Sequence, residues 1–120
     1  MEISQQIDGL IAEAIKTRAS DIYFLPNGEN YLIKIRNQRE VIIWNEIGYL
    51  QARRLMNYCK YVADMALSAQ RRPQIGAMDW NIVDNQSFLR LSSGGNFAGA
   101  ESLVIRIIYS LQDVSTGFFD

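Results

Sequence analysis

The sequence predicts an α+β fold in which about six antiparallel strands form one sheet and two helices pack on one of its faces. Two segments carry apolar residues at helical spacing, and the segments between and after them alternate apolar and polar residues. The links between the alternating segments have hairpin length, which requires antiparallel neighbours. Helices with a single apolar stripe then cover one face of the sheet, in the order helix, three strands, helix, three strands.

The first helix is predicted over residues 3–18. One apolar stripe runs along it, made of Ile3, Ile7, Leu10, Ile11, Ala14 and Ile15. The second helix is predicted over residues 47–69, and its stripe is Ala52, Leu55, Cys59, Val62 and Ala66. Four charged residues lie mostly off that stripe, namely Arg53, Arg54, Lys60 and Asp64, and Pro73 marks the stop.

Strands are predicted at residues 22–25, 31–36, 41–44, 76–83, 88–91 and 103–109. The turn Pro26-Asn27-Gly28 separates the first two, and the glycine-rich stretch 92–100 is expected to be a flexible hairpin loop. The shape that results resembles a PAS-like domain.

Composition excludes several classes of function. The chain has 120 residues, a net charge of -1, one cysteine and no histidine. It is therefore expected to form one domain, without an internal disulfide, a Ser-His-Asp arrangement or a strongly basic nucleic-acid surface. The first residues do not predict a signal peptide, and no apolar stretch has the length of a membrane span.

Neither a nucleotide cradle nor a metal site is indicated. A P-loop needs a lysine after its glycines, and no lysine follows Lys60. Asp79 and Asp84 have no obvious third ligand, so a metal site is not expected. Cys59 is interpreted as a small core residue, because it lies on the apolar stripe of its helix.

Two arginines are the candidates for chemistry. If the last two strands form one hairpin centred on Ala98, then Arg90 and Arg106 are equidistant from its tip and stand opposite each other on one face. Like charges directly opposite destabilise a strand pair, so the pair should have an anionic partner, and a guanidinium suits phosphate or carboxylate. The alternative is two surface arginines, or one of them paired with Glu101.

Four segments carry motifs in a fixed order. They are Ala19-Ser20-Asp21-Ile22-Tyr23-Phe24-Leu25-Pro26, Lys34-Ile35-Arg36-Asn37-Gln38-Arg39, Gln70-Arg71-Arg72-Pro73-Gln74-Ile75-Gly76, and Arg90-Leu91-Ser92-Ser93 followed by Glu101-Ser102-Leu103-Val104-Ile105-Arg106-Ile107-Ile108. Over residues 1–112 the chain resembles the N-terminal domain of the type II secretion and type IV pilus assembly ATPases, and most closely their competence branch. Two departures are Tyr23 in place of histidine and the loss of an Asp-Gly after Arg36.

This resemblance implies a regulatory domain at residues 1–112 and, at 113–120, the start of a linker to a RecA-like motor domain outside this sequence. In the family, the motor binds ATP and Mg²⁺, assembles as a homo-hexamer and works with a polytopic membrane platform protein of the pseudopilus. The location implied is cytoplasmic, peripheral at the inner face of the cell membrane, with no direct nucleic-acid contact.

The resemblance also assigns residue roles. Arg90 and Arg106 would contact ATP held on the motor, whereas Ser20, Asp21, Arg36, Arg72, Pro73, Gln74 and Glu101 would form interdomain or structural motifs. Two alternatives stay open, a free-standing PAS-like sensor of a small ligand and a docking module for the membrane partner. A sensor needs a pocket with convergent polar groups, whereas Met78, Trp80, Leu89 and Ile105 are expected to fill the core.

Overall fold

A computed structural model describes residues 2–67, 73–82, 85–97 and 100–109 of the chain. The elements are α1 (Ile3–Lys16), β1 (Asp21–Asn27), β2 (Asn30–Arg36), β3 (Val41–Gly48), α2 (Tyr49–Val62), β4 (Gln74–Ile82), β5 (Asn85–Phe97) and β6 (Ala100–Tyr109). Their order is the predicted one.

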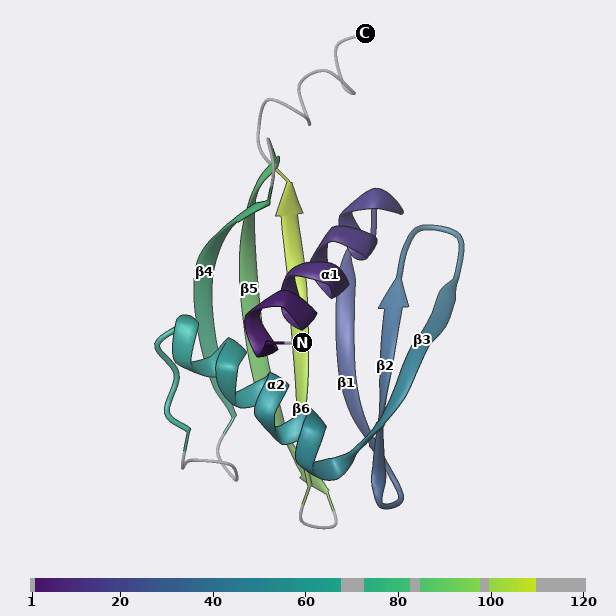
Figure 1. The fold of residues 1–120 in the computed structure, drawn as a ribbon, viewed down its shortest axis with the longest axis vertical. Coiled ribbons are helices and arrows are strands. Elements are labelled where there is room, and N and C mark those ends of the chain that lie inside the picture. The colour runs from purple at the N-terminus through teal and green to yellow at the C-terminus, as the bar shows by residue number, and fades with distance from the viewer. Residues whose placement is uncertain (1, 68–72, 83–84, 98–99, 110–120) are drawn as a thin grey trace, which may run out of the picture.

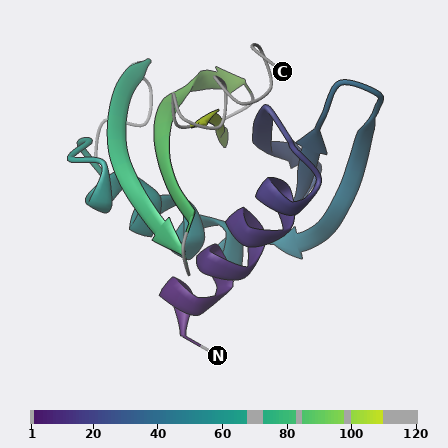
Figure 2. The same ribbon diagram turned by 90° about the horizontal axis from the view of Figure 1, so that it is seen from above.

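All six strands belong to one sheet of order β3-β2-β1-β6-β5-β4, and every neighbouring pair is antiparallel. Both helices lie on the same face of this sheet (Figure 1). Seen from above, the sheet curves around the helices and stays open, with β3 and β4 at its two edges (Figure 2). The predicted α+β class is confirmed, whereas the likeness to a PAS domain stays a prediction.

The core lies between the helices and the inner face of the sheet. Alternate residues of each strand point inward, as in β2, where Tyr31, Ile33 and Ile35 are buried. The four residues expected to fill the core are buried too: Met78, Trp80, Leu89 and Ile105. No helix among the described residues lies on the opposite face of the sheet, which we call the outer face.

The helix α1 packs its predicted stripe on the core, with Ile3 and Ile15 only partly buried, but α2 is shorter than predicted. It ends at Val62 rather than residue 69, because Asp64 takes a left-handed backbone with φ 60°. Ala52, Leu55 and Cys59 are buried as expected, whereas Val62 and Ala66 are exposed. The predicted stripe was therefore wrong at Val62, the last residue of the helix, and at Ala66, which lies beyond its end.

The glycine-rich stretch is mostly strand and not a loop. β5 runs to Phe97 and β6 begins at Ala100, so the hairpin tip is far shorter than residues 92–100. Gly94 pairs with Ser102, whose hydroxyl donates to the Gly94 carbonyl at 2.8 Å. Pairing with β6 therefore holds a segment that its own composition marks as flexible.

Candidate functional site

A row of charged residues crosses the outer face of the sheet at one level. Asp21 of β1 lies opposite Arg36 of β2 on one side and opposite Arg106 of β6 on the other. Arg106 in turn lies opposite Arg90 of β5. The predicted juxtaposition of Arg90 and Arg106 is confirmed, and we call these four residues the arginine row.

Asp21 is the anionic partner within the arginine row. Its Oδ1 accepts a hydrogen bond from Nε of Arg106 at 3.1 Å, and its Oδ2 accepts one from the Ser20 hydroxyl at 2.8 Å. The Asp21 side chain is 5% exposed, whereas that of Arg106 is 66% exposed. The carboxylate is thus held in the sheet surface while the guanidinium extends into solvent.

Arg90 differs from Arg106 in having no such partner. It is exposed, and within the described residues it makes no hydrogen bond or ion pair. The short strand spacing places it beside the charge of Arg106. Its donors remain available for an anion from outside the domain.

Arg36 forms the β2 end of the arginine row. A hydrogen bond with the Tyr23 side chain raises the pKa of the Arg36 guanidinium, and the Asp21 charge acts in the same direction. A hollow of about 370 Å³ opens here, and its lining consists of Ser20, Asp21, Arg36, Asn37, Gln38 and Arg106. Space for a polar ligand therefore exists next to the row.

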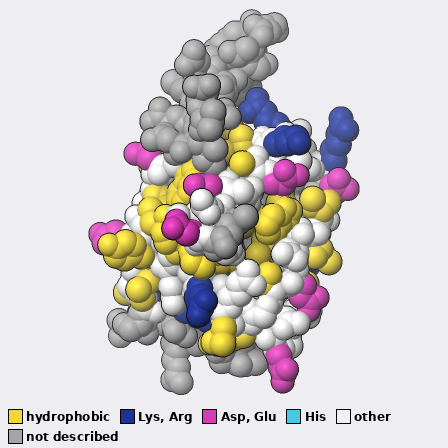
Figure 3. Space-filling view, in the orientation of Figure 1, with side chains coloured by type: hydrophobic (Ala, Val, Ile, Leu, Met, Phe, Trp, Pro, Cys, Tyr) yellow, Lys and Arg dark blue, Asp and Glu magenta, His cyan; other side chains and the backbone are white. Residues whose placement is uncertain are grey.

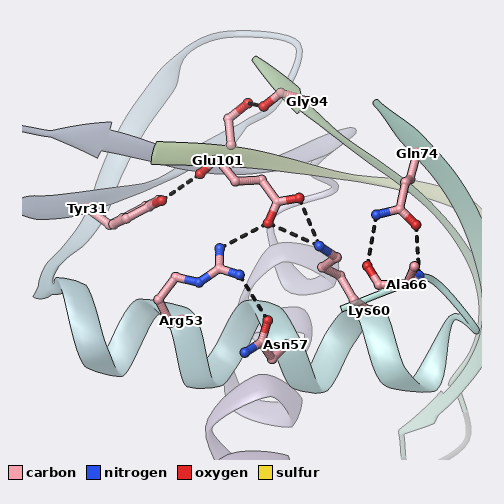
Figure 4. Close-up of polar contacts among 9 residues, drawn as sticks. Tyr31, Arg53, Asn57, Lys60, Ala66, Gln74, Gly94 and Glu101 are labelled. Carbon is pink, nitrogen blue, oxygen red and sulfur yellow. Dashed lines mark hydrogen bonds and ion pairs between the residues drawn. The ribbon is translucent and has the colours of Figure 1, made fainter. Parts of the chain in front are cut away.

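Glu101 lies on the inner face and pairs with none of the three arginines of the row. Its carboxylate accepts hydrogen bonds from Arg53 Nη1 at 2.9 Å and from Lys60 Nζ at 2.8 and 3.1 Å (Figure 4). The Glu101 and Lys60 side chains are fully buried and that of Arg53 is 10% exposed. The suggested pairing of Glu101 with Arg90 or Arg106 was wrong, because Glu101 points to the opposite side of β6.

Two further contacts complete this buried ion cluster of Glu101, Arg53 and Lys60. The Tyr31 hydroxyl donates to the Glu101 carbonyl at 2.6 Å, and Arg53 Nη2 donates to the Asn57 amide oxygen at 3.1 Å. Burial raises the pKa of the Tyr31 hydroxyl, and the charge of Arg53 opposes that shift. The cluster therefore joins α2 to β2 and β6.

The placement of Arg53 and Lys60 off the buried stripe was wrong, and a signal for their burial was present. The two are seven residues apart, which puts them on the same side of a helix. Glu101 alternates with Leu103 and Ile105 along β6, so it faces the core and requires a cation there. Reading these two patterns together would have found the cluster.

The remaining motif residues have separate places. Gln74 lies at the start of β4 and connects it to the segment that follows α2. Its side-chain amide accepts a hydrogen bond from the N–H of Ala66 and donates one to the carbonyl of Ala66 (Figure 4). Pro73 is exposed beside it, and Arg72 lies outside the described residues. The domain boundary at residue 112 also lies outside them.

Cys59 is buried on α2, where burial raises the pKa of its thiol to about 12. Over the parts of the chain that the structure describes, no three acidic, cysteine or histidine side chains gather as a metal site would require. No helix within those parts has the length and apolar character to cross a membrane.

A second hollow, of about 350 Å³, lies on the helix side between α1, β3 and α2. Its lining includes Leu10, Ile33, Trp44, Ile47, Gln51 and Leu55. It is separate from the arginine row, which lies across the sheet. Basic side chains on the helix side gather instead at the end where α1 stops and β2 turns into β3 (Figure 3).

Comparison with known proteins identifies the family. A family model described as type II/IV secretion system protein matches residues 1–116. The competence protein ComGA of Streptococcus pneumoniae is 33% identical over 120 residues, which are 99% of this chain and 37% of that protein. ComGA of Bacillus subtilis is 29% identical over 99 residues, which are 82% of this chain and 28% of that protein.

A third competence protein ComGA, from Halalkalibacterium halodurans, is 31% identical over 77 residues, or 64% of this chain and 22% of that protein. This chain therefore spans between 22% and 37% of the length of these relatives. The matches confirm the resemblance drawn from the four motifs, including its competence branch. The chain belongs to the family of type II/IV secretion system proteins.

Proposed function

We propose that this domain is the N-terminal, nucleotide-contacting part of a hexameric ATPase that drives assembly of the competence pseudopilus for DNA uptake. One observation carries the proposal: Arg90 and Arg106 stand directly opposite each other on the outer face of the sheet. Two adjacent guanidinium groups form a site for an anion with several oxygens, and a polyphosphate is such an anion. The competence proteins among the relatives support the biological setting.

ATP and Mg²⁺ would be held mainly by a RecA-like motor domain. The arginine donors suit phosphate oxygens, but these 120 residues contain no P-loop, whose lysine and following serine or threonine would hold the phosphates and Mg²⁺. Bound ATP supplies the phosphoryl group that is transferred to water. Arg90 and Arg106 would donate hydrogen bonds to its phosphate oxygens as negative charge develops there.

A domain with this function would have its own motor domain and a membrane platform protein as partners. The domain would pack against its own motor domain within a homo-hexamer, at the cytoplasmic face of the membrane, where a polytopic platform protein binds the assembly. Nucleic acid would not contact this domain, which has a net charge of -1.

The test is ATP turnover of the protein that carries the motor domain. We expect Arg90→Ala and Arg106→Ala each to lower turnover, on the order of 10³-fold if each acts as an arginine finger and less if the two share the role. Arg39→Ala is the matched control, since Arg39 is an exposed arginine outside the row. Equal damage from Arg39→Ala, or unchanged turnover in both row variants, contradicts the proposal.

A further inference from the structure

Asp21 has an unusual position in the arginine row, because it is the only acidic member and lies between two arginines. We infer that Asp21 is a positioning residue for Arg106, which it holds in the orientation that presents its free donors to a phosphate. This inference rests on the proposed function, because it assigns the phosphate-reading role to Arg106. Asp21 itself touches no phosphate.

The carboxylate is suited to holding another group in place. Both of its oxygens are engaged, one by Arg106 Nε and the other by the hydroxyl of Ser20. Its side chain is 5% exposed, so it has little freedom to turn toward solvent. A nearly buried carboxylate that accepts two hydrogen bonds on a central strand is a rigid anchor.

The contact leaves most of the arginine donors unused. A guanidinium has five N–H groups, of which Nε carries one and the two Nη atoms carry four. Within the described residues, only Nε of Arg106 makes a hydrogen bond. The Nη atoms remain available, and Arg106 also lines the hollow of about 370 Å³ beside Asp21. Binding through Nε thus orients the group without occupying the atoms that would meet an oxyanion.

The charge of Asp21 serves the pair as well. Arg90 and Arg106 repel each other across the β5–β6 ladder, and Arg90 has no partner of its own within the described residues. With Asp21 neutralised, nothing in the row opposes the separation of the two guanidinium groups. A displacement of about 1 Å in a positioned group can cost on the order of 100-fold in rate.

If Asp21 had a different role, removing its charge would change turnover in the opposite direction. If Asp21 competed with phosphate for Arg106, then removing its charge would release the arginine and raise turnover. The anchoring of Asp21 by Ser20, together with the free Nη atoms, favours positioning over competition.

The decisive experiment is a double-mutant cycle on ATP turnover of the protein that carries the motor domain. Asp21→Asn keeps the shape of the side chain and removes its charge. We expect it to lower kcat on the order of 10-fold, with KM little changed, in the unmodified protein and in an Arg90→Ala background. In an Arg106→Ala background it should have no further effect, because the residue through which it acts is gone.

Each other outcome is informative. Three results for Asp21→Asn overturn the positioning role: an equal loss in the Arg106→Ala background, a rise in turnover, or no change in the otherwise unmodified protein. If Asp21→Asn changes nothing but Arg106→Ala lowers turnover, the proposed function still stands. Unchanged turnover in Arg106→Ala overturns the positioning role, and unchanged turnover in Arg90→Ala as well contradicts the proposed function. Asp79→Asn is the matched control, because Asp79 is an exposed aspartate on the outer face of β4.

A second measurement needs no nucleotide. In nuclear magnetic resonance of the 120-residue chain, the Nε–H of Arg106 should exchange with water more slowly than that of Arg90. Asp21→Asn should remove most of this difference, and Asp79→Asn should not. Equal exchange of the two arginines in the unmodified chain overturns the inference, whatever the effect on turnover.

Discussion

Strand β6 carries one charged residue toward each side of the sheet, and the two have opposite environments. Glu101 faces the helices and is enclosed with Arg53 and Lys60, all within hydrogen-bonding distance. Five residues later, Arg106 faces outward and contacts Asp21 through one nitrogen only. The buried ion cluster has its charges paired inside the protein, whereas the arginine row keeps donors free.

The difference separates two uses of charge. A buried carboxylate with two cations cannot exchange partners without exposing an unpaired charge, so its role is to hold α2 on the sheet. An exposed guanidinium costs little to leave unpaired and can bind an anion that arrives from another domain. Changes in the cluster should therefore affect stability, and under the proposed function changes in the row should affect ATP turnover.

The largest expected effect comes from Glu101→Ala. This change leaves Lys60 buried without its acceptor and removes the main partner of Arg53. We expect the free energy of unfolding to fall by about 3–5 kcal/mol, measured by urea titration of the 120-residue chain. Glu29→Ala, which removes an exposed carboxylate, serves as the control. A loss from Glu101→Ala no larger than that from the control would erase the distinction between cluster and row.

The pH dependence of stability tests the packing of α2 on the sheet through Cys59, which is buried there. Burial raises the pKa of this thiol to about 12, whereas in an unfolded chain it is about 8.5. Between these values only the unfolded state loses the proton, so the free energy of unfolding should fall as pH rises above about 8.5, by at most about 1.4 kcal/mol per unit. Burial also raises the pKa of Tyr31 and Tyr109, so urea titrations are best compared below about pH 10.

The control for that titration is Cys59→Ala, which should weaken the dependence on pH over this range. A stability that is level between about pH 8 and about pH 10 in the unmodified chain would indicate that the thiol ionises within the fold. The surroundings of Cys59 on α2 would then be more accessible to water than the structure shows.

The smallest effects on stability are expected in the row and should differ between Arg90 and Arg106. Arg106→Ala removes the ion-pair partner of the nearly buried Asp21, so a loss of about 1 kcal/mol is expected from thermal or urea unfolding. Arg90→Ala removes a like charge without breaking a contact among the described residues, and stability should stay level or rise slightly. Equal losses in both variants would show that Arg90 has a structural partner.

Much of the fold could be predicted because its elements have strong periodicity. The stripe of α1 and the alternation in β2 are local patterns, and both describe the buried faces correctly. The end of α2 could not be read in this way, because it depends on the backbone conformation of Asp64. The extension of β5 through Gly94 depends on pairing with β6, which the composition of the segment does not reveal.

The candidate site was predicted in part for the same reason. Arg90 and Arg106 belong to one hairpin, so counting residues from its tip places them opposite each other. Asp21 is 85 residues from Arg106 in the sequence, and only the pairing of β1 with β6 brings them together. The burial of Lys60 was missed because the stripe was drawn through the apolar residues alone, which placed Lys60 mostly off it.

The position of β6 in the sheet has a consequence for how the chain folds. β1, β2 and β3 form one antiparallel meander, β4 and β5 form a hairpin, and β6 joins the two. Contacts such as that of Tyr109 with Ala19 span 90 residues, and such long-range pairings form late and slowly. During synthesis on the ribosome, the N-terminal meander must wait with β1 unpaired along one side until β6 has emerged. Because β6 also carries Glu101 and Arg106, neither the buried ion cluster nor the arginine row can exist before β6 has joined the two parts of the sheet.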